Sequence, residues 1–506
     1  MSTVLRLDRI TKRFGRLVAN DEVTLDLEDG EILALLGENG AGKTTLMNIL
    51  FGHYTADAGA VQVFGKTLPP GRPRAAIRVG VGMVHQHFAL ADNLSVLDNI
   101  MLGSEPLLRM RSRRQEGSAR LLALSEKFGL PVDPDARVSG LSVGERQRVE
   151  ILKALYRDAR ILILDEPTAV LARPEARQLF ETLRSMTGQG LSIIFISHKL
   201  YEVMAASDRV AVLREGRKVA ERTTARTTPD ELAELMVGNP VTRPRREDHE
   251  IGAPLLVAED VTVYLDRKPA LQDLTFTVHE GEILGIVGVS GNGQAALGAL
   301  LSGVASPHDG KLMLQGREIG GLGPRAFIAA GIGRIPEDRH AEGVVGELPV
   351  WENSVLERLA TKAFSNLGFV RRRAARDHTR VLIERFDIRG ASPEMRVGLL
   401  SGGNMQKLIL GRVLAAAPGV IIANQPTRGL DEGAIAAVHA ELLSARKAGA
   451  AIILISEELE EALSLSDRLQ AIVGGRLSRP VSAKDANPRR LGLMMAGVWD
   501  EMSNAA

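Results

Sequence analysis

The chain of 506 residues contains no cysteine. This absence excludes disulfide bonds, thiolate zinc sites and iron–sulfur clusters held by cysteine. A surplus of either charge is also missing, because 63 Lys and Arg residues stand against 62 Asp and Glu residues. That balance argues against a dedicated nucleic-acid-binding protein, which usually carries a basic surplus.

Long apolar runs are missing as well. No stretch reaches the ~18–20 apolar residues that a membrane-spanning helix needs. The N-terminal segment MSTVLRLDRITKRFG has no apolar run of signal-peptide length. We therefore expect a cytosolic protein unless a partner holds it at a membrane. The composition, with 45% hydrophobic and 25% charged residues, is otherwise that of a soluble globular protein.

The two halves of the chain repeat each other. Gly37 and Gly288 lie in matching glycine-rich loops 251 positions apart, and the matching Leu141 and Leu400 lie 259 positions apart. The register therefore shifts by eight residues between these motifs. A repeat of this length has the size of a whole domain, so we predict a duplicated domain rather than a solenoid.

The joint between the halves contains Pro240 and Pro244, a run of charges and no apolar periodicity, as expected of a linker. We predict a first domain at residues 1–238, a linker at 239–253 and a second domain at 254–506.

Short apolar runs precede the motifs of the first half, namely Glu31–Leu36, Ile161–Leu164 and Ser192–Ile196. Helix-like stretches follow two of them, at Lys43–Leu50 and Glu145–Leu155. Continuous apolar strands suit a sheet that is covered on both faces, so we predict α/β domains with a mainly parallel sheet. The intervals from Phe88 to Arg137 and from Arg339 to Arg396 look more purely helical.

The first glycine-rich loop follows an apolar strand and opens a helix, which is the context that a phosphate-binding loop requires. It reads Gly37-Glu38-Asn39-Gly40-Ala41-Gly42-Lys43-Thr44. Glycines let backbone N–H groups close around phosphate oxygens at a helix N-terminus. Lys43 would neutralise the β- and γ-phosphates, and Thr44 would ligate Mg²⁺. In the second copy, Gln294 replaces the lysine and Ala295 replaces the threonine.

Two acids, Asp165 and Glu166, end the apolar strand ILIL. Asp165 can hold the magnesium shell, and Glu166 can orient and polarise an attacking water. Gln86 and His198 each follow a short strand and are ambiguous by themselves. Phe14 could stack on an adenine, although a buried aromatic would look the same in the sequence.

These motifs in this order resemble the ATP-binding-cassette ATPases. The decisive element is the signature, which reads LSVGERQ from Leu141 and LSGGNMQK from Leu400. The resemblance covers nearly the whole chain. It implies two tandem cassettes, each with a mainly parallel sheet core, an antiparallel β part and a helical subdomain. ATP and Mg²⁺ are the implied ligands.

The resemblance also assigns roles to individual residues. Glu166, His198 (the switch histidine) and Gln86 (in the Q-loop) are implied as catalytic, and Thr44, Gln86 and Asp165 as metal-binding. The residues implied in nucleotide binding are Phe14, Gly37, Glu38, Asn39, Gly40, Ala41, Gly42, Lys43, Thr44, Thr45, Ser401, Gly402, Gly403, Gln406 and the D-loop residue Asp431.

In cassette dimers, each ATP lies between the phosphate loop of one domain and the signature of the other. One composite site would join the first-half motifs with Ser401, Gly402, Gly403 and Asp431, and each member is of the expected type. The other site carries the substitutions Gln294, Ala295, Glu337, Asn424, Gln425 and Glu457, together with Val143 and Ala172 from the first half. Because the losses all fall on one composite site, we predict one hydrolytic and one structural site.

Within this superfamily the chain is similar to the fused double-cassette ATPases of bacterial sugar and nucleoside importers. The segments Gly82–Ile100 and Ile422–Asp431 look like the nucleoside branch, so a nucleoside is the expected solute and a sugar is the second choice. The implied partners are two transmembrane permeases and an extracytoplasmic solute-binding (lipo)protein. The implied location is the cytoplasmic face of the inner or plasma membrane.

Another class of function is a soluble tandem-cassette translation factor. Such factors usually keep both sites competent and have a long charged helical linker, whereas this chain has one altered site and a short linker with prolines. No nucleic acid is expected as a partner.

Overall fold

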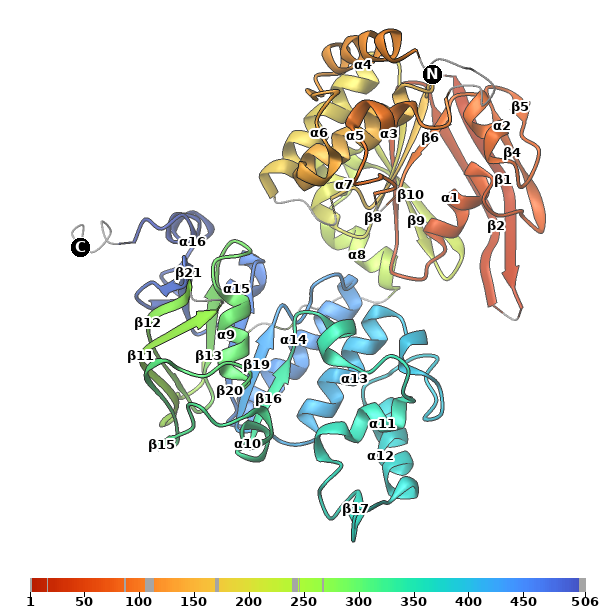
Figure 1. Ribbon diagram of the computed structural model, residues 1–506. Coiled ribbons are helices and arrows are strands. Elements are labelled where there is room, and N and C mark those ends of the chain that lie inside the picture. Colours follow the sequence, from red (N-terminus) through yellow and green to blue (C-terminus); the bar gives the residue numbers. More distant parts are fainter. Residues whose placement is uncertain are drawn as a thin grey trace. The chain divides into compact units, whose positions relative to one another are not determined.

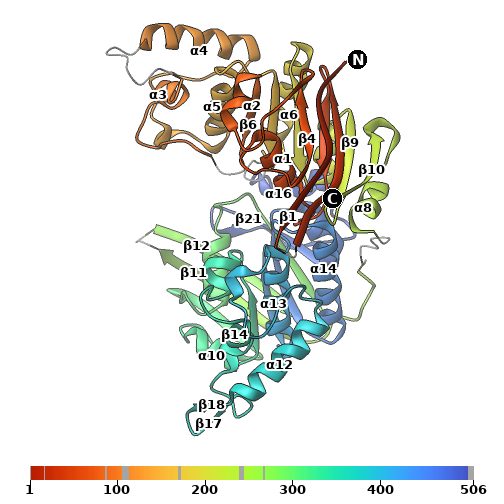
Figure 2. The same cartoon turned by 90° about the vertical axis from the view of Figure 1, so that its right-hand side faces the viewer.

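The computed structural model describes residues 2–15, 17–85, 88–104, 113–168, 173–238, 244, 246–265 and 268–499. The chain divides into two compact units, one of residues 1–241 with 431–433 and one of residues 242–430 with 434–506. Each unit combines sheets with surrounding helices (Figures 1 and 2). The predicted linker, residues 239–253, spans this division.

The first unit contains two sheets. The antiparallel sheet has the order β2-β1-β4-β5 and is built from β1 (Thr3–Phe14), β2 (Leu17–Glu28), β4 (Ala58–Val63) and β5 (Lys66–Thr67). The larger sheet has the order β10-β9-β3-β8-β7-β6 and is built from β3 (Ile32–Leu36), β6 (Val81–Val84), β7 (Ile161–Asp165), β8 (Ser192–Ser197), β9 (Arg209–Arg214) and β10 (Arg217–Thr223). Its strands pair in parallel, except that β10 runs antiparallel to β9.

The helices of the first unit connect these strands. They are α1 (Lys43–Phe51), α2 (Pro73–Arg78), α3 (Val96–Met101), α4 (Arg114–Phe128), α5 (Val143–Leu155), α6 (Arg173–Gly188), α7 (Leu200–Ala206) and α8 (Pro229–Val237). Helices α3, α4 and α5 lie together and form the helical part of the unit (Figure 1). Among the described residues, no helix is both long enough and apolar enough to cross a bilayer.

The second unit repeats both sheets. The antiparallel sheet, of order β12-β11-β14-β15, is built from β11 (Pro254–Leu265), β12 (Lys268–His279), β14 (Asp309–Leu314) and β15 (Arg317–Glu318). The mainly parallel sheet has the order β16-β19-β20-β13-β21-β22, with β23 paired to β21. Its strands are β13 (Ile283–Val287), β16 (Ile332–Ile335), β19 (Val420–Asn424), β20 (Ala451–Ser456), β21 (Arg468–Val473), β22 (Arg476–Leu477) and β23 (Val481–Ser482).

The helices of the second unit come in the same order. They are α9 (Gln294–Leu301), α10 (Pro324–Ala329), α11 (Val350–Val355), α12 (Arg372–Arg385), α13 (Gly402–Leu414), α14 (Glu432–Lys447), α15 (Leu459–Leu465) and α16 (Pro488–Met495). A π-helical turn at Arg339–Gly343 and a short hairpin of β17 (Ser365–Asn366) and β18 (Phe369–Val370) are added.

The central strands have apolar residues at every position because both faces of the sheet are covered. Along β3, Ile32, Ala34 and Leu36 pack into one hydrophobic cluster, whereas Leu33 and Leu35 pack into a second cluster on the other face. The sequence-based prediction of two α/β cassettes with a mainly parallel core and an antiparallel part is therefore confirmed.

Five residues of the eight-residue register shift have a structural location. Equivalent isolated bridges join Ser95 to Arg137 and Pro349 to Arg396. The second interval is five residues longer than the first, and it contains the β17–β18 hairpin. This interval was predicted to be purely helical, so the hairpin is an exception that the apolar pattern did not indicate.

An aspartate anchors the strand that leads into each glycine-rich loop. Asp208 accepts a hydrogen bond of 2.9 Å from the backbone of Ile32, and Asp467 accepts one of the same length from Ile283. Asp467 also pairs with Arg446 at 2.8 Å, and the Arg446 side chain is only 4% exposed.

We expect Asp467→Asn to lower the free energy of unfolding of the second unit by about 3–5 kcal/mol, because it leaves the buried Arg446 guanidinium without a carboxylate. Both tryptophans lie in this unit, so urea unfolding followed by tryptophan fluorescence measures it. The matched control Asp273→Asn removes an exposed pair with Arg476 and should cost less than about 1 kcal/mol. Equal losses in the two variants would contradict the buried role of Asp467.

Candidate functional site

The first glycine-rich loop joins the end of β3 to the start of α1. Gly42 adopts a φ of 96°, and a Cβ atom added there would lie 2.2 Å from the carbonyl oxygen of Ala19. Only glycine fits this position, since both the backbone conformation and the contact exclude a side chain. The Asn20 amide donates to the Gly42 carbonyl at 3.1 Å and holds the loop against β2.

Lys43 begins α1 and is 5% exposed. Its ammonium donates to the carbonyl oxygens of Gly37 at 2.7 Å and Glu38 at 3.0 Å. Burial lowers the pKa of Lys43, and the negative charges of Glu166 and Asp165 act in the opposite direction. The side chain therefore places a desolvated positive charge at the loop, which suits a phosphate ligand.

Asp165 ends β7 and lies 5% exposed beside the loop. Burial raises its pKa, the neighbouring Glu166 raises it further, and Lys43 opposes both effects. The nearby Thr44 hydroxyl acts in the same direction as Lys43 and lowers this pKa. Thr44 and Asp165, which were predicted as metal ligands, thus present two hard oxygen donors to the same place.

Glu166 and His198 form a hydrogen-bonded pair, with 2.9 Å between Nδ1 of the ring and Oε1 of the carboxylate. Burial alone would raise the pKa of Glu166, but the hydrogen bond and charge of His198 outweigh it, and the pKa is lowered. Glu166 has a φ of 45°. A non-glycine residue in the left-handed region is strained, and such strain is common at functional sites.

The second loop keeps the backbone of the first but has different chemistry. Gln294 donates from its amide to the Val289 carbonyl at 2.8 Å, and its side-chain oxygen accepts from the Asn292 backbone at 2.9 Å. Val289 occupies the position of Glu38. The glutamine therefore makes the same kind of bond as Lys43, but it closes the loop with two neutral hydrogen bonds and offers no charge to a phosphate.

The carboxylate positions of the second unit are altered in a correlated way. Asn424 replaces Asp165, and its side-chain oxygen is buried without a hydrogen-bond partner among the described residues. Asp165 has the Thr44 hydroxyl nearby, whereas Ala295, at the position of Thr44, has no hydroxyl. Gln425 keeps a positive φ of 50°, like Glu166. Its side-chain oxygen accepts a long hydrogen bond of 3.5 Å from the backbone N–H of Glu457.

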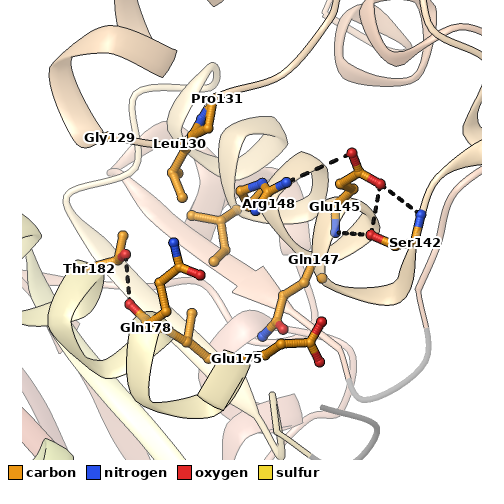
Figure 3. Close-up of a pocket in the computed structure, with 13 residues that line it drawn as sticks. Gly129, Leu130, Pro131, Ser142, Glu145, Gln147, Arg148, Glu175, Gln178 and Thr182 are labelled. Atoms are coloured by element: carbon orange, nitrogen blue, oxygen red, sulfur yellow. Dashed lines mark hydrogen bonds and ion pairs between the residues drawn. The ribbon is translucent and has the colours of Figure 1, made fainter. Parts of the chain in front are cut away.

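The two signature segments differ in charge. Ser142 caps α5 in a capping box with Glu145, and the Glu175 carboxylate lies beside Gly144 (Figure 3). In the second unit, Asn404 occupies the position of Glu145 and Ala434 occupies the position of Glu175. The Asn404 side-chain amide donates to the Ser401 hydroxyl at 3.0 Å. The N-terminus of α13 has no acid in its first turn, so it is the better place for an anion.

Other predicted site residues have mixed outcomes. Phe14 is 44% exposed, makes an edge contact with Tyr54, and has the Lys12 ammonium over its ring at 5.3 Å from the centroid. Gln406 is buried and donates to the Pro426 carbonyl at 2.8 Å. Asp431 directly precedes α14. Gln86 and Ala172 lie outside the described residues, and the assigned roles all stay predictions.

A buried network that the sequence did not reveal supports the catalytic segment. Glu202, on α7, accepts hydrogen bonds from Thr168 and from Ser197, the residue before His198. Glu461 accepts equivalent bonds from Thr427 and Ser456. The sequence does carry an indication of this network, because each half has an acid on a short apolar helix. Arg339 was also missed, and its guanidinium lies beside the signature residue Gly402.

We expect His198→Gln to move the acidic limb of the ATP hydrolysis profile to higher pH. The hydrogen bond and charge of the imidazole lower the pKa of Glu166, so their removal raises that pKa even though Lys43 and Lys199 still lower it. The phosphate release that remains in the His198→Gln variant, measured as a function of pH, tests this shift. His308→Gln on the second unit serves as the control. An unshifted limb would show that His198 does not set the ionisation of Glu166.

Comparison with known proteins agrees with this geometry. The family described as ABC transporter matches residues 20–169 and 271–428. The chain is 43% identical to the guanosine import ATP-binding protein NupO of Bacillus subtilis and 42% identical to the nucleoside import ATP-binding protein NupA of Lactococcus lactis, each over 98% of both chains. It is 41% identical to the glucose import ATP-binding protein TsgD13 of Haloferax volcanii, over 99% of this chain and 97% of the relative.

Solved structures include a chain from the complex of the archaeal ribosomal stalk protein aP1 and the ribosome recycling factor aABCE1. It covers 96% of this chain and 92% of its own length, with a TM-score of 0.64 and 19% identity, and this likeness shows the fold alone. The two family matches and the full-length relatives carry the assignment. The chain belongs to the ABC transporter family and consists of two fused ATP-binding cassettes.

Proposed function

We propose that this chain hydrolyses ATP at a single composite site and thereby drives the import of a nucleoside. The observation that carries the proposal is the asymmetry between the two units. Lys43, Asp165 and the Glu166–His198 pair lie together in the first unit. The equivalent positions of the second unit hold neutral amides and a glutamate in place of the histidine.

The residues of the first unit fit a magnesium-bound triphosphate. The glycine loop provides the cradle, Lys43 neutralises phosphate charge, and Thr44 and Asp165 supply oxygen ligands for the metal. When bound, Mg²⁺ supplies positive charge to the phosphates. The lowered pKa of Glu166 keeps it ionised at neutral pH, so it can orient the attacking water and accept its proton.

The second unit contributes its signature to this site. Ser401 and the backbone of Gly402 and Gly403 would complete the binding of the γ-phosphate, with Asp431 as the D-loop residue. Charge supports this choice, because Asn404 and Ala434 are neutral where the first unit has Glu145 and Glu175. At the first signature these two carboxylates come with Arg148, which pairs with Glu145 at 3.9 Å, so the difference between the two signatures lies in the two acids themselves.

Import requires partners that this chain does not contain. We propose two transmembrane permeases and an extracytoplasmic solute-binding (lipo)protein, with the chain attached peripherally at the cytoplasmic face of the membrane. The names of the full-length relatives, which are import ATP-binding proteins, support this arrangement.

Two of these relatives support a nucleoside as the solute. The segments Gly82–Ile100 and Ile422–Asp431, which resemble the nucleoside branch, agree with this choice. A sugar is the second candidate, favoured by the glucose import relative at 41% identity.

The two signature serines should differ in importance. Ser401→Arg blocks approach of the only signature that serves the hydrolytic site, and the loss of one such donor costs on the order of 10²–10³ in rate. Ser142→Arg alters the signature that faces the altered loop, so a much smaller loss is expected. The measurement is ATP hydrolysis by the permease-bound complex, after circular dichroism has shown that both variants fold. Equal losses would exclude a single working composite site.

Uptake of radiolabelled solutes tests the proposed transport. In a strain from which this chain is deleted, we expect uptake of a purine nucleoside to fall to background and to return with the wild-type chain but not with Lys43→Ala. Uptake of ribose, galactose and glucose should persist. Loss of uptake of one of these sugars, with nucleoside uptake intact, would reverse the order of the two candidates.

A further inference from the structure

The β17–β18 hairpin is a feature that the ATPase chemistry does not use. It projects from the helical part of the second unit, between α11 and α12, and both views show it at the edge of that unit (Figures 1 and 2). The hairpin falls in the interval that is five residues longer than its counterpart in the first unit.

The tip of this hairpin is apolar and exposed. Leu367 is 91% exposed and Phe369 is 80% exposed, which makes them the two most exposed large apolar side chains in the described part of the chain. Leu367 and Gly368 form the turn with φ values of 49° and 85°. Turns of this kind favour Asn-Gly or Asp-Gly, because a bulky residue is strained at positive φ. Leucine is therefore not explained by the stability of the turn.

Positive charge surrounds the apolar tip. Between Lys362 and Arg373 the chain has four basic residues and no acidic residue. Arg371, Arg372 and Arg373 are all exposed, and Arg371 also donates to the Lys362 carbonyl at 3.2 Å, which holds the base of the hairpin to the start of α12. The nearby acid Asp377 is paired with Arg380.

We propose that the β17–β18 hairpin and the arginines that come after it form a contact surface for an anionic lipid bilayer. Leu367 and Phe369 would enter the interface between headgroups and acyl chains, and Arg371, Arg372 and Arg373 would bind the phosphate headgroups. The inference rests on the proposed function, in which the chain works at the cytoplasmic face of a membrane.

The charge of the surface favours lipid over the other candidate partners. Cytoplasmic loops of membrane proteins carry an excess of Lys and Arg, so they would be repelled by these arginines. The cytoplasmic leaflet carries anionic lipids that attract them. A nucleic acid would also attract the arginines, but two aliphatic or aromatic side chains raised on a turn fit the apolar depth of a bilayer better.

Vesicle flotation of the purified full-length chain, without permeases, tests the proposal. The probes are vesicles of phosphatidylcholine alone and vesicles that also contain phosphatidylglycerol. We expect binding only to the anionic vesicles and a weaker signal at high salt. The triple variant Arg371→Gln, Arg372→Gln, Arg373→Gln should bind at least about tenfold more weakly, since each charge near an anionic surface contributes severalfold.

The apolar tip is tested with Leu367→Asn combined with Phe369→Ser. Asparagine suits the turn better than leucine, so the variant should fold at least as well as the wild type and still lose vesicle binding. Arg325→Gln and Val304→Ser change exposed residues elsewhere on the second unit and should bind normally. Chemical unfolding of every variant confirms that the fold is kept.

Two results would overturn the proposal: wild-type chain that floats with neither vesicle, or hairpin variants that float as well as the wild type. Binding of a transfer RNA that competes with anionic vesicles at equal charge would assign the surface to nucleic acid instead. None of these outcomes affects the importer assignment, which fails separately if the chain does not reach the membrane fraction when its permeases are present.

Discussion

The buried ammonium of Lys43 is the interaction on which the catalytic unit depends. It lies at the N-terminus of a helix, bonded to two loop carbonyls, in the field of Asp165 and Glu166. Without a positive charge there, two buried carboxylates and the phosphates of a bound nucleotide would repel one another. The strand, the loop and the helix place this one charge in the loop that we propose binds the β- and γ-phosphates.

The second unit has the same loop without that positive charge. Gln294 preserves the hydrogen bond to the loop and so preserves the backbone, and Gln425 keeps the strained conformation of Glu166. The substitutions therefore alter chemistry while the scaffold stays intact. Asn424, with its buried oxygen left without a partner among the described residues, shows that the loss of the Thr44 hydroxyl was not compensated in packing. Such a unit can still support a partner structurally.

Electrostatics also distinguishes the two signatures and gives each unit a different task. Glu145 and Glu175 lie at the first signature together with Arg148, whereas neutral side chains, Asn404 and Ala434, occupy the matching positions of the second. The second unit also carries the basic hairpin region of residues 362–373. The nearly balanced net charge of the whole chain therefore coexists with a locally basic surface on the second unit.

The sequence by itself determined the duplicated α/β fold, the phosphate loop and the identity of its substituted copy. These features depend on local patterns, because an apolar run followed by glycines and a helix-forming stretch can adopt few other structures. Only the tertiary structure decided the contacts between distant segments: the Glu202 network, the approach of Glu175 to Gly144 and the exposure of Leu367. A side chain's partners depend on which elements pack together, and a leucine reads as core in sequence until the fold places it on a projecting turn.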